Sequence, residues 1–450
     1  MRPARAPAMS KDSVPMARDV RRSLAAEPGL PGSTFEWVEA LRSAAIERFR
    51  KSGFPTPKVE AWKFTKLGPL ERIAFRSDTG QAGPIVTKAA LAPYRLTPEC
   101  HLAVFVNGRF RPDLSALDHL PTGTAVVGLA SAGEDDLRAL LAPPAVATEA
   151  RARALFDLNT ATAGDGAVIH LGRGAVLDPV QLLFVAVPDG EPKVFHPRSL
   201  IDAEAGSSAT VLETYVSLGE GVYWTNAVTQ VLVARNAVLR HYKLQAEGGS
   251  AYHVAATSVR LDHEAAYRMF ALSLGAVLSR NEFDIELAAA SAETRLSGAS
   301  LARGEQHLDT TIRVDHAKPL GSSTQAFRSV VDGRAHTVFQ GRIRVAPDAQ
   351  KTDAQQISRS LLLSATASAD TKPELEILAD DVKCSHGAAV GDLDKDALFY
   401  LRARGMGEEE ASRILIDAFV GELIGAVESD AARPYFRRAF DRWLSEGMGS

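Results

Sequence analysis

The stretches Ile312-Arg313-Val314-Asp315 and Ile343-Arg344-Val345-Ala346 decide the fold, because their pattern of apolar, variable, apolar residue recurs through much of the chain. The other copies are Ser199-Leu200-Ile201-Asp202, Val231-Leu232-Val233-Ala234, Val259-Arg260-Leu261-Asp262, Ile285-Glu286-Leu287-Ala288 and Leu375-Glu376-Ile377-Leu378. Successive copies start 32, 28, 26, 27, 31 and 32 residues apart. Strand-type alternation at such intervals predicts a parallel β-solenoid, whose coils stack about 4.8 Å apart. A β-sandwich, which also has many short strands, is the competing interpretation.

The bulk composition is that of an ordinary globular chain. The 450 residues include 24% charged and 46% hydrophobic residues, and the net charge is −4. This charge gives no electrostatic footprint for nucleic acid, and no polybasic run or long apolar run indicates a membrane. Cys100 and Cys384 are too few for a disulfide framework, so we expect a cytoplasmic protein in a reducing compartment.

The chain divides into four predicted regions. Residues 1–30 are expected to form a disordered tail, and residues 31–165 a mixed α/β domain. In that domain Ser33-Thr34-Phe35-Glu36 is a capping-box signature for a helix that ends at Gly53, and Asn107-Gly108 predicts a β-hairpin turn. Residues 166–390 form the predicted solenoid, and residues 391–450 a helical domain.

Three amphipathic helices are predicted in the C-terminal region. Asp394 can N-cap the first helix, which runs to Gly405, and Glu408 opens the second. Their apolar stripes are Leu398 and Leu401, then Ala411, Ile414, Leu415, Ala418 and Phe419, and finally Phe436, Ala439, Phe440, Trp443 and Leu444. We expect this region to cap the exposed strand edge of the solenoid. The apolar faces exceed what a cap needs, so they predict either a docked partner or a small bundle.

The segment Cys384-Ser385-His386-Gly387 is the strongest candidate site. Side chains at i and i+2 share one face of a strand, so Cys384 and His386 can point to the same side. A thiolate and an imidazole together suit iron, iron–sulfur clusters or zinc. Two ligands do not close a metal site, so another chain or a substrate would have to supply the rest. The alternative is that Cys384 simply packs as a small hydrophobic residue.

Other catalytic signatures are missing from the sequence. No Gly-Lys dipeptide occurs, so there is no Walker A phosphate loop, and there is no Cys-x-x-Cys, His-Glu-x-x-His or Gly-x-Ser-x-Gly motif. The column after each repeat unit reads Asp202, Ala234, Asp262, Ala288, Asp315, Ala346 and Leu378. With no acids on adjacent coils, this column disfavours the alternative function, a polysaccharide-active β-helix enzyme. His263 and His316 are predicted to occupy solvated turn positions.

Several of these motifs resemble the SufB/SufD family of the SUF iron–sulfur cluster assembly machinery. The match is best around Cys384, in the Cys-Ser-His-Gly-Ala-Ala-Val-Gly stretch and the Leu-Phe-Tyr-Leu-Arg-Ala-Arg-Gly stretch from Leu398. The segments Arg313-Val314-Asp315-His316 and Gln340-Gly341-Arg342-Ile343-Arg344-Val345 resemble the family core, and Glu60-Ala61-Trp62-Lys63-Phe64-Thr65 resembles an N-terminal element. The motif is closer to the SufD branch than to SufB, in which this segment is nearer to Cys-Glu-His-Glu.

The resemblance implies a mainly β fold, in which a right-handed parallel β-helix is flanked by an N-terminal α/β region and a C-terminal helical domain. It implies a non-catalytic scaffold subunit that works with a SufB-like subunit and a SufC-like ATPase. His386, and secondarily Cys384, would be transient ligands of iron or of a cluster shared with SufB, with no cofactor held tightly by the isolated chain. Leu398, Leu401, Ile414, Leu415 and Phe419 would bind the ATPase. An uncovered solenoid edge also predicts that isolated chains can form homodimers.

Overall fold

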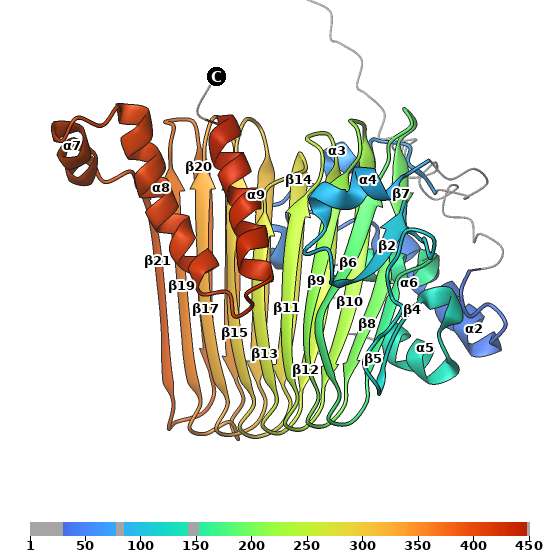
Figure 1. The fold of residues 1–450 in the computed structure, drawn as a ribbon. Coiled ribbons are helices and arrows are strands. Elements are labelled where there is room, and N and C mark those ends of the chain that lie inside the picture. Colours follow the sequence, from blue (N-terminus) through green and yellow to red (C-terminus); the bar gives the residue numbers. More distant parts are fainter. Residues whose placement is uncertain (1–29, 78–84, 143–152, 448–450) are drawn as a thin grey trace, which may run out of the picture.

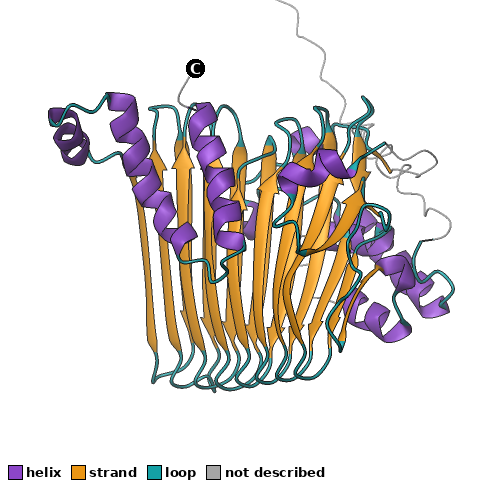
Figure 2. Ribbon diagram, viewed as in Figure 1, coloured by secondary structure: helices purple, strands orange, loops and turns teal. Residues whose placement is uncertain are grey.

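The computed structural model describes residues 30–77, 85–142 and 153–447 (Figure 1). The predicted tail therefore lies almost wholly outside the described residues. The fold is mainly β, with two long sheets that run the length of the molecule and helices along their sides (Figure 2). We call the 11-stranded sheet, which ends in β20, sheet A, and the 10-stranded sheet, which ends in β21, sheet B.

The chain alternates between core strands of the two sheets. From β8 onward, and leaving out the short strand β7, each strand pairs in parallel with the strand two before it in the chain. In sheet A these strands are β5 (Ala167–Leu171), β8 (Arg198–Ala203), β10 (Tyr223–Val233), β12 (Tyr252–Leu261), β14 (Leu278–Leu287), β16 (His307–His316), β18 (His336–Val345) and β20 (Ser368–Ile377). In sheet B they are β6 (Val176–Ala186), β9 (Ser208–Ser217), β11 (Val238–Ala246), β13 (Ala266–Ser273), β15 (Glu293–Ala302), β17 (Ser322–Val331), β19 (Asp353–Leu362) and β21 (Lys383–Asp392). The predicted β-solenoid is thus confirmed over the sandwich.

The predicted register is wrong at two of the repeats. Ile285 pairs with Val314 rather than Ile312, and Val231 pairs with Ile201 rather than Ser199. A slip of two residues keeps every side chain on the same face of its strand, so the apolar alternation alone cannot detect it. Phe283 and Ile285, for example, both lie buried in the solenoid core.

Most of the N-terminal elements lie at the first coils of the solenoid (Figure 1), but Ala61 and Trp62 lie farther along, where they contact β14 and β18. The helices are α2 (Glu36–Ser52), α3 (Gly68–Glu71), α4 (Lys88–Leu91), α5 (Glu134–Leu141) and α6 (Ala154–Thr162), with single turns η1 (Glu60–Trp62), η2 (Ala92–Tyr94) and η3 (Leu129–Ser131). The strands are β1 (Arg76–Ser77), β2 (His101–Val106), β3 (Arg109–Phe110) and β4 (Thr124–Gly128); β7 (Lys193–Phe195) joins β1 to the solenoid. Strand β4 pairs with β5, and β2 pairs with β6, so the N-terminal end of each sheet is covered.

Two local predictions for this region have opposite outcomes. The hairpin is confirmed, since β2 and β3 are antiparallel and Asn107 and Gly108 have φ values of 48° and 75°. The capping box is wrong: Phe35 occupies the N-cap of α2, and no side chain caps the helix. Gly53 ends α2, as predicted, with a φ of 65°.

The C-terminal helices do not cap the solenoid end, which corrects our expectation. They are α7 (Lys395–Ala403), α8 (Glu408–Gly425) and α9 (Ala432–Gly447), and α8 and α9 run along the outer face of sheet B (Figure 1). That face carries a buried apolar patch to cover: the Phe436 ring of α9 packs 4.8 Å from Phe270 and 6.2 Å from Tyr242, centroid to centroid. Covering this patch removes its apolar surface from water, which favours packing of the helices on this face.

The prediction that His316 is solvated is also wrong. Its side chain is fully buried, with Nε2 2.8 Å from Ser323 Oγ. Burial lowers the pKa of His316 from 6.5 to about 4. The unfolded chain therefore takes up this proton at a higher pH than the folded chain does.

This burial predicts a loss of stability in mild acid. As the pH falls from about 6.5 to 4, the difference between the pKa of His316 in the unfolded and the folded chain should lower the free energy of unfolding by about 3 kcal/mol. Urea unfolding of wild type and His316→Gln at pH 7 and pH 4.5 measures this. The variant should show the shallower pH dependence, and the control His263→Gln, at a half-exposed turn position, should behave as wild type. Equal pH dependence in all three proteins would contradict the assignment of this stability loss to His316.

Candidate functional site

Cys384 and His386 lie on β21, the last strand of sheet B, and both belong to its inner face. The register pairs Cys384 with Ala354 and His386 with Gln356, and both partners are buried inside the solenoid. Side chains in one column of a parallel sheet point the same way. The prediction that this thiol and imidazole share a face is therefore confirmed.

The residue of β20 that faces His386 across the last coil can be inferred from a contact in the preceding coil. A Cβ on Gly341 would lie only 1.8 Å from Nε2 of Gln356, so the Gln356 side chain crosses the solenoid to reach Gly341. In the next coil His386 follows Gln356, and Pro373 follows Gly341. His386 consequently faces the Pro373 side of β20 across the open end.

Within the described residues, no strand pairs with the outer edges of β20 and β21. The side chains there are correspondingly open: His386 is exposed and Cys384 is half-buried. Ile377, Leu378 and Val390 are large apolar side chains left exposed at this end. The site therefore combines two ligand-type side chains, an apolar rim and unpaired backbone.

The environment of Cys384 favours the protonated thiol. Its side chain packs against a buried apolar cluster that includes Ile343. Partial burial, and then the negative charge of Asp353, raise the pKa of Cys384 above its ordinary value. A metal ion would have to displace this proton to form a thiolate ligand. Among the residues that the structure describes, no group of three or more His, Cys, Asp or Glu side chains is arranged to hold a metal ion.

The apolar residues predicted to bind a partner lie on α7 and α8. Leu398, Leu401 and Leu415 are half-buried, and Ile414 is 40% exposed. Phe419 is also half-buried, and its ring lies 5.2 Å from the Arg328 guanidinium. Phe399 and Tyr400, which are 75% and 55% exposed, were not among the predicted binding residues. Four consecutive bulky apolar residues from Leu398 cannot all face one side of a helix, and that signal could have found them.

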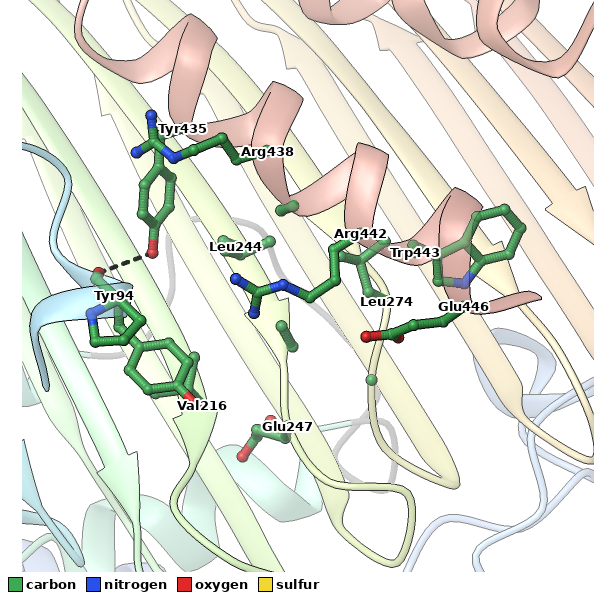
Figure 3. A pocket seen from close by; sticks show the side chains of 14 residues that line it. Tyr94, Val216, Leu244, Glu247, Leu274, Tyr435, Arg438, Arg442, Trp443 and Glu446 are labelled. Atoms are coloured by element: carbon green, nitrogen blue, oxygen red, sulfur yellow. Dashed lines mark hydrogen bonds between the residues drawn. The ribbon is translucent and has the colours of Figure 1, made fainter. Parts of the chain in front are cut away.

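A pocket of about 250 Å³ lies between α9, the turn η2 and the outer face of sheet B (Figure 3). Arg438, Arg442 and Trp443 line it from α9, and Glu247 lies at the opposite side. The Tyr435 hydroxyl donates a hydrogen bond of 3.0 Å to the Tyr94 carbonyl, which ties α9 to η2. The solenoid residues that line it lie on β9, on β11 and in the segments that follow β11 and β13. These are several coils from β21, so this pocket is separate from Cys384 and His386.

The observed strand register changes which carboxylates lie side by side on adjacent coils. It still disfavours a polysaccharide-active enzyme. Glu286 and Asp315 are direct partners on adjacent coils, which the predicted register had separated. Each is already neutralised: Arg260 pairs with Glu286, and Arg344 lies 3.1 Å from Asp315. A glycosidase-type acid and base would need carboxylates that are free to exchange protons with a substrate.

These features define a β-solenoid protein with a thiol–imidazole pair at an open strand edge. Comparison with known proteins is consistent with this class. Residues 29–182 match the SufBD protein N-terminal region, and residues 185–419 match the SufBD core domain of the SUF system for FeS cluster assembly. The chain belongs to the SufB/SufD family of SUF-system iron–sulfur cluster assembly proteins.

Similar proteins cover most of the chain. An iron–sulfur cluster assembly SufBD family protein of Synechocystis is 33% identical over 402 residues, 86% of each chain. The iron–sulfur cluster assembly protein SufD of Escherichia coli is 33% identical over 391 residues, 86% of this chain and 89% of the relative. Protein ABCI7, chloroplastic, of Arabidopsis thaliana is 31% identical over 422 residues, 91% of this chain and 86% of the relative. No helix in the described part of this chain is long and apolar enough to cross a membrane.

The environment of Cys384 predicts slow alkylation. At pH 8 its thiol should react with iodoacetamide more slowly than a free model thiol, because less of it is thiolate. Asp353→Asn removes the neighbouring negative charge that helps to raise the pKa of the thiol, and should therefore speed the reaction. Peptide mass spectrometry over time distinguishes Cys384 from Cys100, which is buried. An unchanged or slower rate in Asp353→Asn would contradict the assigned cause.

Proposed function

We propose that this chain is a SufD-like, non-catalytic subunit of a cytoplasmic iron–sulfur cluster assembly complex, together with a SufB-like scaffold subunit and a SufC-like ATPase. The observation that carries the proposal is the position of Cys384 and His386, on an uncovered terminal strand of a SufB/SufD-family solenoid. We keep the division into a tail (1–30), an α/β domain (31–165), a β-helix core (166–390) and a helical domain (391–450) as part of this proposal.

The SufB-like subunit would add its own strands to the open edge. A strand edge binds a partner through main-chain hydrogen bonds, and proteins usually protect free edges with charges or proline. The neighbouring strand β20 contains Lys372, Pro373 and Glu374 in sequence, whereas residues 384–391 of β21 contain no Asp, Glu, Lys, Arg or Pro. Strand β21 is thus the better suited of the two to pairing. Without a SufB-like partner, the same edge would let isolated chains pair with one another.

His386 would supply an imidazole to iron or to the forming cluster at this junction, and Cys384 would assist as a soft ligand. The exposed imidazole can reach an ion without any movement of the solenoid, while the thiol must first lose its proton. The remaining ligands would come from the SufB-like subunit. Binding would be transient, since neither chain would hold a complete site alone.

The SufC-like ATPase would dock on α7 and α8. The exposed faces there include Ile414, Phe399 and Tyr400 beside the predicted residues Leu398, Leu401, Leu415 and Phe419. Helix α7 projects beyond the last coil (Figure 1), so it is accessible from several sides. The exposed aromatic side chains of α7 would gain from burial against a partner.

Co-expression with SufB- and SufC-like partners, followed by anaerobic reconstitution, tests this function. His386→Ala should leave the complex intact but lower its iron and sulfide content several-fold, because one ligand is lost. The matched control His263→Ala, at a turn of the solenoid distant from β21, should retain both. Unchanged iron and sulfide in an intact His386→Ala complex would refute the ligand role. Failure of the wild-type chain to form a complex would refute the subunit role.

A further inference from the structure

A second site lies on the outer face of sheet A, where the N-terminal segment 60–65 crosses the solenoid. Trp62 is buried there, with the Arg280 guanidinium 4.1 Å from its ring centroid. Arg280 Nη2 also donates a hydrogen bond of 2.8 Å to the Ala61 carbonyl, and Nη1 pairs with Asp309. These contacts fix the segment against β14 and β16 and bring Thr65 next to Asp309 and His307.

The hydrogen bonds of Thr65 define the protonation of His307. The Thr65 hydroxyl donates its single proton to the Asp309 carboxylate, which can only accept. Its oxygen also lies 2.9 Å from His307 Nε2. Because the hydroxyl proton is already used, Nε2 of His307 has to be the donor. In a neutral imidazole whose proton is on Nε2, the other ring nitrogen, Nδ1, carries a bare lone pair.

His336 on the next coil is oriented in the same way. Its Nε2 lies 2.8 Å from Asp370 Oδ2, and since an ionised carboxylate only accepts, Nε2 is again the donor. A neutral His336 ring with its proton on Nε2 has a bare acceptor at Nδ1 too. The two Nδ1 atoms face each other at 3.1 Å. Two lone pairs at that distance repel unless a positive charge lies between them.

A metal ion fits this geometry. Two nitrogens bound to one ion at about 2.1 Å are separated by about 3.0 Å when their bonds are at right angles, and by about 3.4 Å in a tetrahedron. Imidazole ligands of metals characteristically donate their other N–H to a carboxylate or another oxygen, as both rings do here. The side chains of His336 and Asp370 are 27% and 44% exposed, so solvent reaches the site.

We propose that His307 and His336 bind a divalent first-row transition metal ion through their Nδ1 atoms, with water in the remaining coordination positions. Neutral imidazole suits borderline ions such as Zn²⁺ and Fe²⁺ better than Mg²⁺ or Ca²⁺. With two protein ligands, the ion stays exchangeable. The site lies on β16 and β18 of sheet A, away from Cys384 and His386 on β21 of sheet B. It does not rest on the proposed function.

Calorimetric titration of the chelator-treated full-length chain with Zn²⁺ tests the proposal. The His386→Ala background removes one ligand of the other candidate site and should still bind one equivalent at the histidine pair. Adding His336→Gln to that background should abolish this equivalent. Adding Asp370→Asn, which leaves both rings in place, should weaken binding by roughly 10- to 100-fold. Adding His263→Gln as a control should change nothing.

X-ray absorption of the bound zinc supplies a readout that folding alone would not move. The expected spectrum contains nitrogen and oxygen ligands without sulfur, which excludes Cys384 as a ligand. The proposal is overturned if no stoichiometric binding occurs, which would mean that the two rings share only a proton. It is equally overturned if His336→Gln or Asp370→Asn, folded as judged by circular dichroism, binds zinc as tightly as the background.

Discussion

Parallel pairing between successive coils is the interaction on which this structure depends. Each strand satisfies its backbone groups only through the coil before it and the coil after it, so a solenoid cannot complete its own hydrogen bonds at either end. At the N-terminal end β4 and the β2–β3 hairpin complete the sheets. At the other end β20 and β21 have outer edges that no described strand covers. This asymmetry leaves one end of the molecule free to bind, and the strand at that end carries the thiol–imidazole pair.

The remaining elements attach to the sides of the solenoid and not to its open end. Segment 60–65 packs on sheet A through Trp62 and Arg280, and α8 and α9 pack on sheet B. Both arrangements follow from apolar or paired polar residues on the outer faces of strands, where alternate side chains point away from the core. The side helices thus stabilise the solenoid without blocking β21. One chain can in this way present an open edge and, on α7 and α8, a second exposed surface.

The sequence predicted the features that depend on local alternation, and it failed where long-range packing decides. Period-two patterns were enough to predict the solenoid and to place Cys384 and His386 on one face. The pairing of Ile285 with Val314 was not predicted, because a shift of two residues preserves the alternation of apolar residues. The burial of His316 and the pairing of His307 with His336 depend on coils 29 residues or so apart in sequence. The contact of Thr65 with His307 spans 242 positions, and no local pattern encodes it.

Hydrogen exchange of the β21 amides tests the central claim that this edge is completed by a partner strand. The measurement compares the dilute isolated chain with the assembled complex containing SufB- and SufC-like subunits, with the interior strand β11 as the internal reference. We expect that amides of residues 384–391 that point away from β19 exchange fast in the isolated chain and become strongly protected in the complex, while β11 stays protected in both. Equally fast exchange of those amides in an intact complex would contradict it.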